Sequence, residues 1–207
     1  MIYLIGGAPR CGKTMLSKQL AKQKGVSWLS TDTIRQMVVA CTPPEQREQK
    51  FPYVRLQRPI APYHDVNDYP PRILLNAEIK ESRSIWPSTR KLIEELVESR
   101  EDFVIEGVHL MPVLIQHLKK TLVWKQIRLV YLVKTNTDDI LVGFHKNTSK
   151  HDWLSGALDN EALLTKVGRM VQMKSKYIVQ EAKKFGFTTI DTGKSFETKL
   201  GSALERF

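Results

Sequence analysis

The feature that most constrains this chain is a glycine-rich turn close to its amino end. Residues 7–14 read G-A-P-R-C-G-K-T, which fits the pattern G-x-x-x-x-G-K-[ST] without a mismatch. The apolar run Ile2 to Gly6 before the turn predicts a buried strand, and residues 14–24 have the pattern of a helix. A strand, a glycine-rich loop and a helix in this order are typical of the first unit of an open α/β sheet.

Each residue type in the turn suits the binding of a nucleoside triphosphate. Glycines let backbone N–H groups close around phosphate oxygens, and the following helix presents its positive end. We expect Lys13 to reach the β- and γ-phosphates and Thr14 to hold Mg²⁺, so ATP and Mg²⁺ are the predicted cofactors. The predicted nucleotide-binding residues are Gly7, Ala8, Pro9, Arg10, Cys11, Gly12, Lys13 and Thr14. Cys11 stands at an unconstrained position, which favours a filler residue over a redox switch.

The rest of the chain alternates between strand-like and helix-like segments. Strands are predicted at 26–30, 103–105, 127–133 and 188–191, and helices at 33–39, 88–99, 113–120, 161–185 and 195–204, with a further helix beginning at Thr137. Pro87 suits the first turn of the helix over 88–99. The alternation predicts a three-layer α/β fold, with a five-stranded parallel sheet and helices on both faces. The length of 207 residues suits one domain, 1–207.

Two stretches interrupt this alternation. Residues 41–72 are rich in proline, with tyrosines and arginines between the prolines, and we interpret them as an irregular insertion that covers the substrate. Residues 145–160 are polar and basic and predict a lid, since cationic lids stabilise a phosphoryl group in transfer and exclude water. Arg169, on the helix that leaves the lid, is the candidate for the catalytic cation.

Composition narrows the classes of protein further. The longest apolar run is too short for a bilayer span and no secretory signal opens the chain, so we expect a cytoplasmic protein without a membrane partner. The two cysteines, Cys11 and Cys41, predict neither a disulfide framework nor a zinc site. A formal charge of +10 attracts anions, but the basic residues are scattered, as on an ordinary basic surface.

Three side chains after predicted strands are candidates for chemistry at the same edge of the sheet. Asp32 could accept the proton of a substrate hydroxyl, or it could simply cap the helix over 33–39. Arg35 could bind a substrate carboxylate or phosphate in forked geometry, or lie in solvent. Glu106 ends the third strand, which we expect beside the first, so that it lies near Thr14 and the metal ion.

Three blocks of the chain together resemble a known group of enzymes. Ile5 to Thr14, the run S-T-D-T-I-R at Ser30 to Arg35, and the run I-E-G-V-H-L-M-P at Ile105 to Pro112 resemble nucleoside-monophosphate-kinase-like small kinases, most of all 2-phosphoglycerate kinases. The resemblance implies a P-loop NTPase fold and transfer of the ATP γ-phosphoryl group to a hydroxyl of an anionic small metabolite. It also implies a substrate-binding role for His109.

Other functions stay open at this point. The same framework resembles zeta-toxin-like sugar-nucleotide kinases and chloramphenicol phosphotransferases. A polynucleotide 5′-kinase or nucleic-acid-binding ATPase would use the positive charge, with bases stacked between residues of the insertion, namely Tyr53, Tyr63, Tyr69, Arg55, Arg58 and Arg72; we do not favour it. A nucleotide-binding regulator or toxin is a third class. A Ras-type GTPase is not supported, because no N-K-x-D motif follows the fourth strand. The oligomeric state is left open.

Overall fold

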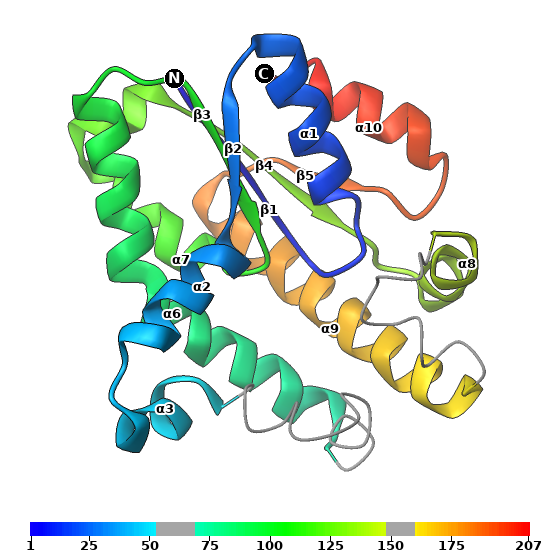
Figure 1. The fold of residues 1–207 in the computed structure, drawn as a ribbon. Helices are drawn as coiled ribbons and strands as arrows, with labels where there is room; N and C mark the ends of the chain where they lie inside the picture. Colours follow the sequence, from blue (N-terminus) through cyan, green and yellow to red (C-terminus); the bar gives the residue numbers. More distant parts are fainter. Residues whose placement is uncertain (53–68, 148–159) are drawn as a thin grey trace.

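All strands in the described part of the chain pair in parallel in a single sheet. The computed structural model describes residues 1–52, 69–147 and 160–207. The sheet has five strands in the order β2-β3-β1-β4-β5 (Figure 1). The strands are β1 (Ile2–Gly7), β2 (Ser27–Ser30), β3 (Phe103–Gly107), β4 (Ile127–Val133) and β5 (Thr189–Asp191). The predicted parallel sheet is confirmed.

Helices cover both faces of this sheet. Helices α1 (Lys13–Lys24) and α10 (Phe196–Leu204) lie on one face, whereas α6 (Pro71–Glu98), α7 (Pro112–Ile115) and α9 (Glu161–Phe185) lie on the other (Figure 1). Alternate side chains of β1 pack against the helices on opposite faces of the sheet. Tyr3 and Ile5 belong to the apolar cluster that contains Leu16 of α1, while Ile2 and Leu4 pack with Ile93 of α6. The predicted three-layer architecture is therefore confirmed.

Shorter elements connect these layers. They are α2 (Thr31–Cys41), α3 (Pro44–Lys50), α8 (Thr137–Asn147) and the 3-10 helices η1 (Gln116–Lys120) and η2 (Leu122–Gln126). In the register of the sheet, Glu106 pairs with Ile5 across β3 and β1, and Ser30 pairs with Glu106 across β2 and β3. The carboxyl ends of β1, β2 and β3 therefore meet at one edge, where the glycine-rich loop begins.

The structure corrects the predicted role of Pro87. This residue lies inside α6 rather than at the start of a helix. Its ring faces solvent, where water can bond to the carbonyl group that lacks an intrahelical partner. The helix continues through the proline because Ile85, Thr89 and Ile93 form one buried stripe on its other side.

The two predicted interruptions are partly helical. Within 41–72, residues 44–50 form α3 and residues 71–72 begin α6, so the insertion that was expected to be irregular is helical in part. Residues 145–147 end α8, and the side chain of Asn160 caps α9 by accepting from the Leu163 N–H at 3.0 Å. Residues 53–68 and 148–159 of the two segments lie outside the described residues, and they include Tyr53, Tyr63, Arg55 and Arg58.

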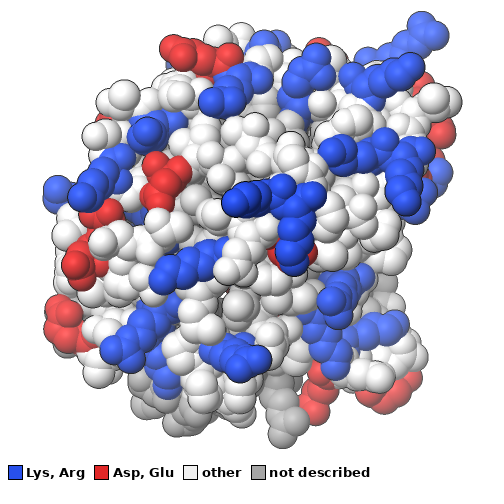
Figure 2. Space-filling view, turned by 180° about the vertical axis from the view of Figure 1, so that it is seen from behind, with Lys and Arg blue, Asp and Glu red and all other residues white. Residues whose placement is uncertain are grey.

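The lengths of the helices and the distribution of basic side chains bear on two other kinds of partner, a membrane and a nucleic acid. Across residues 1–52, 69–147 and 160–207, no helix combines the length and apolar character that crossing a bilayer needs. Figure 2 shows Lys and Arg over the face turned away from Figure 1 as separate groups with uncharged surface between them. Within the part of the chain that is described, this face presents no continuous basic stripe of the kind that follows a nucleic-acid backbone.

Candidate active site

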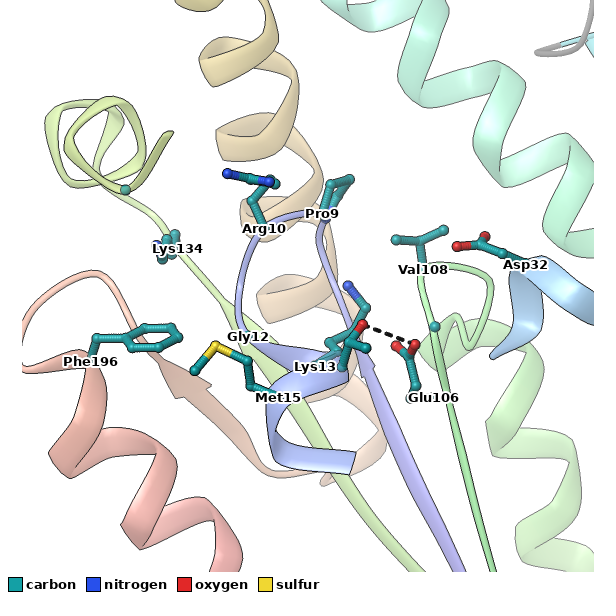
Figure 3. A pocket seen from close by; sticks show the side chains of 13 residues that line it. Pro9, Arg10, Gly12, Lys13, Met15, Asp32, Glu106, Val108, Lys134 and Phe196 are labelled. Atoms are coloured by element: carbon teal, nitrogen blue, oxygen red, sulfur yellow. Dashed lines mark hydrogen bonds between the residues drawn. The ribbon is translucent and has the colours of Figure 1, made fainter. Parts of the chain in front are cut away.

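A cavity of about 400 Å³ opens at the carboxyl end of the sheet, around the glycine-rich loop. The loop after β1, the end of β3, the residues that follow β3 and β4, the starts of α1, α2 and α10, and one residue of α8 supply its walls. Open α/β sheets bind their ligands at this edge. The lining residues are Pro9, Arg10, Gly12, Lys13, Thr14, Met15, Asp32, Glu106, Gly107, Val108, Lys134, Gly143 and Phe196 (Figure 3).

The glycine-rich loop has the conformation that an anion site needs. Gly12 stands directly before α1 with φ 94°, in the region that favours glycine, and within the described chain no side chain caps this helix. The first N–H groups of α1 are therefore available to a ligand. Lys13 is buried, and its Nζ donates to the carbonyl oxygen of Ala8 at 2.8 Å. This bond folds the lysine over the loop, beside the cavity.

Side-chain oxygens of Thr14 and Glu106 lie next to each other below the loop. Thr14 Oγ1 donates to Glu106 Oε1 at 3.1 Å, the contact drawn as a dashed line in Figure 3. Oxygens that bind one Mg²⁺ at about 2.1 Å in neighbouring octahedral positions lie about 3 Å apart, so this separation fits the ion. Burial raises the pKa of Glu106, and the nearby Lys13 ammonium opposes that shift.

Few protein ligands are needed for such an ion. No cluster of three or more His, Cys, Asp or Glu side chains suited to a metal occurs among the described residues. Mg²⁺ keeps several waters and usually takes one or two protein ligands together with phosphates of its nucleotide. The Thr14–Glu106 pair therefore fits a nucleotide-associated Mg²⁺ better than a protein-enclosed metal.

The side chain of Asp32 lines the cavity and does not cap a helix. Ser30 caps α2, since its side chain accepts from the Asp32 N–H at 3.2 Å, so the alternative that Asp32 is the helix cap is wrong. The Asp32 side chain is 69% exposed and lines the cavity. Figure 3 shows it across the cavity from the loop, on the same side as Glu106.

Arg35 lies deeper than either sequence interpretation suggested. It is buried, and its Nε donates to Glu81 Oε2 of α6 at 2.6 Å, so the alternative of a solvent-exposed arginine is wrong. Within the described chain, Arg35 Nη2 is buried without a hydrogen-bond partner. A buried guanidinium nitrogen with an unused donor is costly unless a ligand or another group completes it.

His109 is also buried, behind Asp32. Its Nδ1 lies 3.0 Å from Thr31 Oγ1 and 3.6 Å from Asp32 Oδ1. Burial holds the pKa of His109 well below its usual value, and the positive charges of Lys174, Arg35 and Lys13 lower it further. The imidazole is therefore neutral near pH 7, and its contact with Asp32 is a dipole interaction rather than an ion pair.

A second buried ion pair, which the sequence analysis missed, lies below this group. Lys174 of α9 is 0% exposed, and its Nζ donates to Glu78 Oε2 of α6 at 2.7 Å. Burial lowers the pKa of Lys174, while Glu78 opposes that shift. The available signal was a lysine at helical spacing within the apolar stripe of Val167, Val171 and Ile178.

The opposite end of the cavity has an aromatic wall. Phe196 and Met15 face each other there (Figure 3), and Lys134 Nζ lies 5.3 Å from the centroid of the Phe196 ring. Burial lowers the pKa of Lys134. The sequence analysis did not single out these residues, although Lys134 directly follows a strand that was predicted correctly.

The structure brings together most of the predicted site residues. Pro9, Arg10, Gly12, Lys13, Thr14, Asp32 and Glu106 line the cavity. Gly7, Ala8 and Cys11 are buried within the loop, and burial raises the pKa of the Cys11 thiol to about 11, as expected for a filler residue. Arg35 and His109 lie behind Asp32. Arg169 is exposed on α9 and does not line the cavity. The functional roles of all these residues stay predictions.

Comparisons with known proteins identify the fold. No family model and no curated protein sequence matches the chain. Among solved structures, it is similar to a gluconokinase from Sinorhizobium meliloti 1021, with TM-score 0.55 and 15% identity over 99% of this chain and 89% of the other. It is also similar to a shikimate kinase from Acinetobacter baumannii in complex with shikimate, with TM-score 0.53, 16% identity, and coverage of 99% and 90%. The chain therefore has the P-loop NTPase fold.

Proposed function

We propose that this protein is an ATP- and Mg²⁺-dependent phosphotransferase that acts on a hydroxyl of an anionic small metabolite. One observation carries the proposal: a single cavity joins the glycine-rich loop, the Thr14–Glu106 pair and the exposed carboxylate of Asp32. Phosphoryl transfer needs a phosphate cradle, a metal site and a group that takes the proton of the acceptor hydroxyl, all within reach of one another.

The shape of the cavity suggests how the substrates lie. The phosphates would bind along the loop and the start of α1, where N–H groups and Lys13 offer positive charge. The nucleobase would then lie toward Phe196, whose ring offers a flat apolar surface. The acceptor would lie at the other end, beside Asp32, so the reacting oxygen and the γ-phosphorus meet next to Glu106.

The proposed reaction assigns a task to each of these groups. The acceptor oxygen forms a bond to the γ-phosphorus as the bond from that phosphorus to the β–γ bridging oxygen breaks, and ADP leaves. The hydroxyl proton passes to the Asp32 carboxylate. Lys13 stabilises negative charge on the transferring group. Mg²⁺, when bound, neutralises charge on the β- and γ-phosphate oxygens.

An anionic acceptor is supported by one unused hydrogen-bond donor behind Asp32. Arg35 Nη2 offers a donor that no described residue satisfies, and a carboxylate or phosphate would complete it. The solved structures with this fold are named gluconokinase and shikimate kinase, which supports a small-molecule acceptor. We propose 2-phosphoglycerate as the first acceptor to test, on the resemblance of the three sequence blocks.

The test is an assay of ADP release with a panel of acceptors. The purified protein with Mg²⁺ and ATP would be given 2-phosphoglycerate, gluconate, shikimate, a sugar nucleotide or a 5′-hydroxyl oligonucleotide. We expect one of the small acids to increase ADP release and to appear as its phosphate ester. Stimulation by the oligonucleotide alone would favour the polynucleotide kinase, and ADP release that no acceptor changes would contradict a phosphotransferase.

A further inference from the structure

Two segments that are far apart in the sequence meet behind Asp32. Thr31 begins α2, and His109 follows β3 in the turn that leads to α7; both side chains are buried. Their polar atoms lie 3.0 Å apart, from His109 Nδ1 to Thr31 Oγ1. Asp32, the next residue after Thr31, points the other way, into the cavity, with its Oδ1 still 3.6 Å from the same ring nitrogen.

Gly107 fixes Thr31 from the other side. A Cβ atom at Gly107 would lie 1.7 Å from Thr31 Oγ1, and the residue has φ +155°. The threonine side chain therefore packs directly on the backbone of β3, immediately after Glu106. This packing is open only to glycine, and it ties the start of α2 to the strand that carries the candidate metal ligand.

Two neighbours of His109 Nδ1 favour one of the two positions of the ring proton. A carboxylate accepts hydrogen bonds, whereas a threonine hydroxyl both donates and accepts. A proton on Nδ1 gives an attractive contact with Thr31 Oγ1 and with Asp32 Oδ1 together. A bare Nδ1 would instead direct its lone pair at the carboxylate. The contact with Asp32 therefore favours the neutral Nδ1–H form, which Thr31 Oγ1 accommodates as an acceptor.

We propose that His109 and Thr31 are positioning residues: the Nδ1–H group of His109, held by Thr31, fixes the Asp32 carboxylate in the orientation that receives the acceptor proton. The inference rests on the proposed phosphotransfer, and it replaces substrate contact as the role of His109. An exposed carboxylate samples several rotamers, so a fixed dipole behind it raises the fraction of time in which it is aligned. Misalignment by about 1 Å can cost about a hundredfold in rate.

Conservative substitutions separate positioning from simple packing. His109→Asn places an amide near the position of Nδ1, whereas His109→Gln places it toward Nε2. Thr31→Val keeps the shape of the side chain without its hydroxyl, and Thr31→Ser keeps the hydroxyl. We expect His109→Gln and Thr31→Val to lower kcat by about tenfold to a hundredfold with little change in the KM for ATP. His109→Asn and Thr31→Ser should stay within about threefold of the unsubstituted enzyme.

A double-substitution cycle tests whether His109 acts through Asp32. In a protein that already carries Asp32→Asn, His109→Gln should have little further effect on kcat, because the group that it orients is gone. An equal loss in both backgrounds would overturn the proposal. The proposal would also be overturned if His109→Asn and His109→Gln lost equal amounts of kcat and if these losses followed the decrease in unfolding midpoint. Such a result would indicate that His109 acts through packing alone.

An NMR measurement that requires no catalysis tests the state of His109 independently of the proposed reaction. The ¹⁵N chemical shifts of the His109 ring in the full-length protein distinguish the Nδ1–H form from the Nε2–H form. We expect Nδ1–H, with a shift of its resonance in the Asp32→Asn variant. An Nε2–H ring would overturn the proposal even if phosphotransfer is demonstrated. Nδ1–H in a protein that phosphorylates no acceptor would show that the contact stands and the proposed function fails.

Discussion

The two ends of the cavity are built in different ways. At the end that we assign to the nucleotide, one unbroken run of residues, 7–14, contributes Pro9, Arg10, Gly12, Lys13 and Thr14 to the lining. Behind Asp32, side chains from α2, α6 and α9 meet in pairs separated by 46 residues for Arg35 and Glu81 and by 96 residues for Lys174 and Glu78. The first end depends on local conformation and the second on tertiary packing.

This difference has an energetic consequence. Backbone N–H groups of the loop and helix carry no net charge and need no partner of opposite sign. The pairs behind Asp32 bury full charges, and each pair stays neutral only while both members are present. We therefore expect substitutions in these two buried ion pairs to act mainly on folding, and substitutions in the loop to act mainly on turnover.

The largest effect should come from breaking the Lys174–Glu78 pair. Lys174→Met leaves the Glu78 carboxylate buried and unpaired, so we expect the free energy of unfolding to fall by about 3–5 kcal/mol. Urea denaturation measures this loss. Lys174→Met combined with Glu78→Leu should recover most of it, and Lys176→Met, at an exposed position of the same helix, should change stability by less than about 0.5 kcal/mol. If Lys174→Met and Lys176→Met were equally stable, the Lys174–Glu78 pair would not stabilise the fold, and the proposed difference between the two ends of the cavity would be wrong.

At the nucleotide end, Lys13→Ala should leave a folded protein with little turnover. Loss of one charged donor to the transferring group costs about a hundredfold to a thousandfold in kcat. Steady-state ADP release with the preferred acceptor measures the effect. Lys22→Ala, at an exposed position on α1, is the matched control and should keep normal turnover. If both variants turned over alike, the loop would have no part in the reaction.

The aromatic wall should affect binding rather than rate. Phe196→Ala should weaken ATP binding by about 1–3 kcal/mol, the usual range for stacking of a base on an aromatic ring. Phe196→Tyr keeps the ring and should bind ATP nearly normally. Calorimetric titration of ATP into each variant makes the comparison. Unchanged affinity in Phe196→Ala would place the base elsewhere.

The smallest expected effect is the dependence of stability on pH that results from the buried His109. His109 has a pKa well below its ordinary value of 6.5 in the folded protein, because it is buried and faces Lys174 of α9, Arg35 of α2 and Lys13 of α1. The unfolded chain therefore takes up a proton that the folded protein does not, and stability should fall as pH drops below about 6.5. The slope for one proton is at most about 1.4 kcal/mol per pH unit.

Comparison with a variant isolates this contribution. His109→Asn should lose less stability than the unsubstituted protein between pH 7 and pH 5, and denaturant midpoints at several pH values measure the difference. The carboxylate of Asp32, which lies 3.6 Å from the ring, opposes the shift and should make it smaller. Identical pH dependence in the two proteins would mean that His109 is protonated in the folded state.

The same contrast explains how much of the site could be predicted from the sequence. The loop is a contiguous motif, and the position of Glu106 beside Thr14 followed from the expected neighbourhood of the first and third strands, which the register of Ile5 and Glu106 confirms. The parallel sheet followed from the alternation of strands and helices. These features depend on local pattern and on general rules of connection.

The pairs behind Asp32 could not be predicted in this way. Glu78 and Lys174 are ordinary surface residue types, and only the packing of α6 against α9 shows that each one faces the other. Pro87 misled the analysis for a related reason, because a proline at the exposed side of a long helix has the same local signal as a proline that begins one. The Lys174–Glu78 pair and the position of Pro87 inside α6 both depend on long-range packing, which a local sequence pattern does not show.

The bond from Lys13 Nζ to the Ala8 carbonyl oxygen bears on which anions the loop will hold. To bind Lys13, a phosphate oxygen must replace the Ala8 carbonyl oxygen as the acceptor of the Nζ hydrogen bond. A lysine in solvent would instead exchange only water for the phosphate. A ligand with two or three linked phosphates can replace that contact and fill the circle of N–H groups at the same time. Inorganic phosphate offers fewer oxygens for these contacts, so we expect the loop to bind chains of phosphates more tightly than inorganic phosphate.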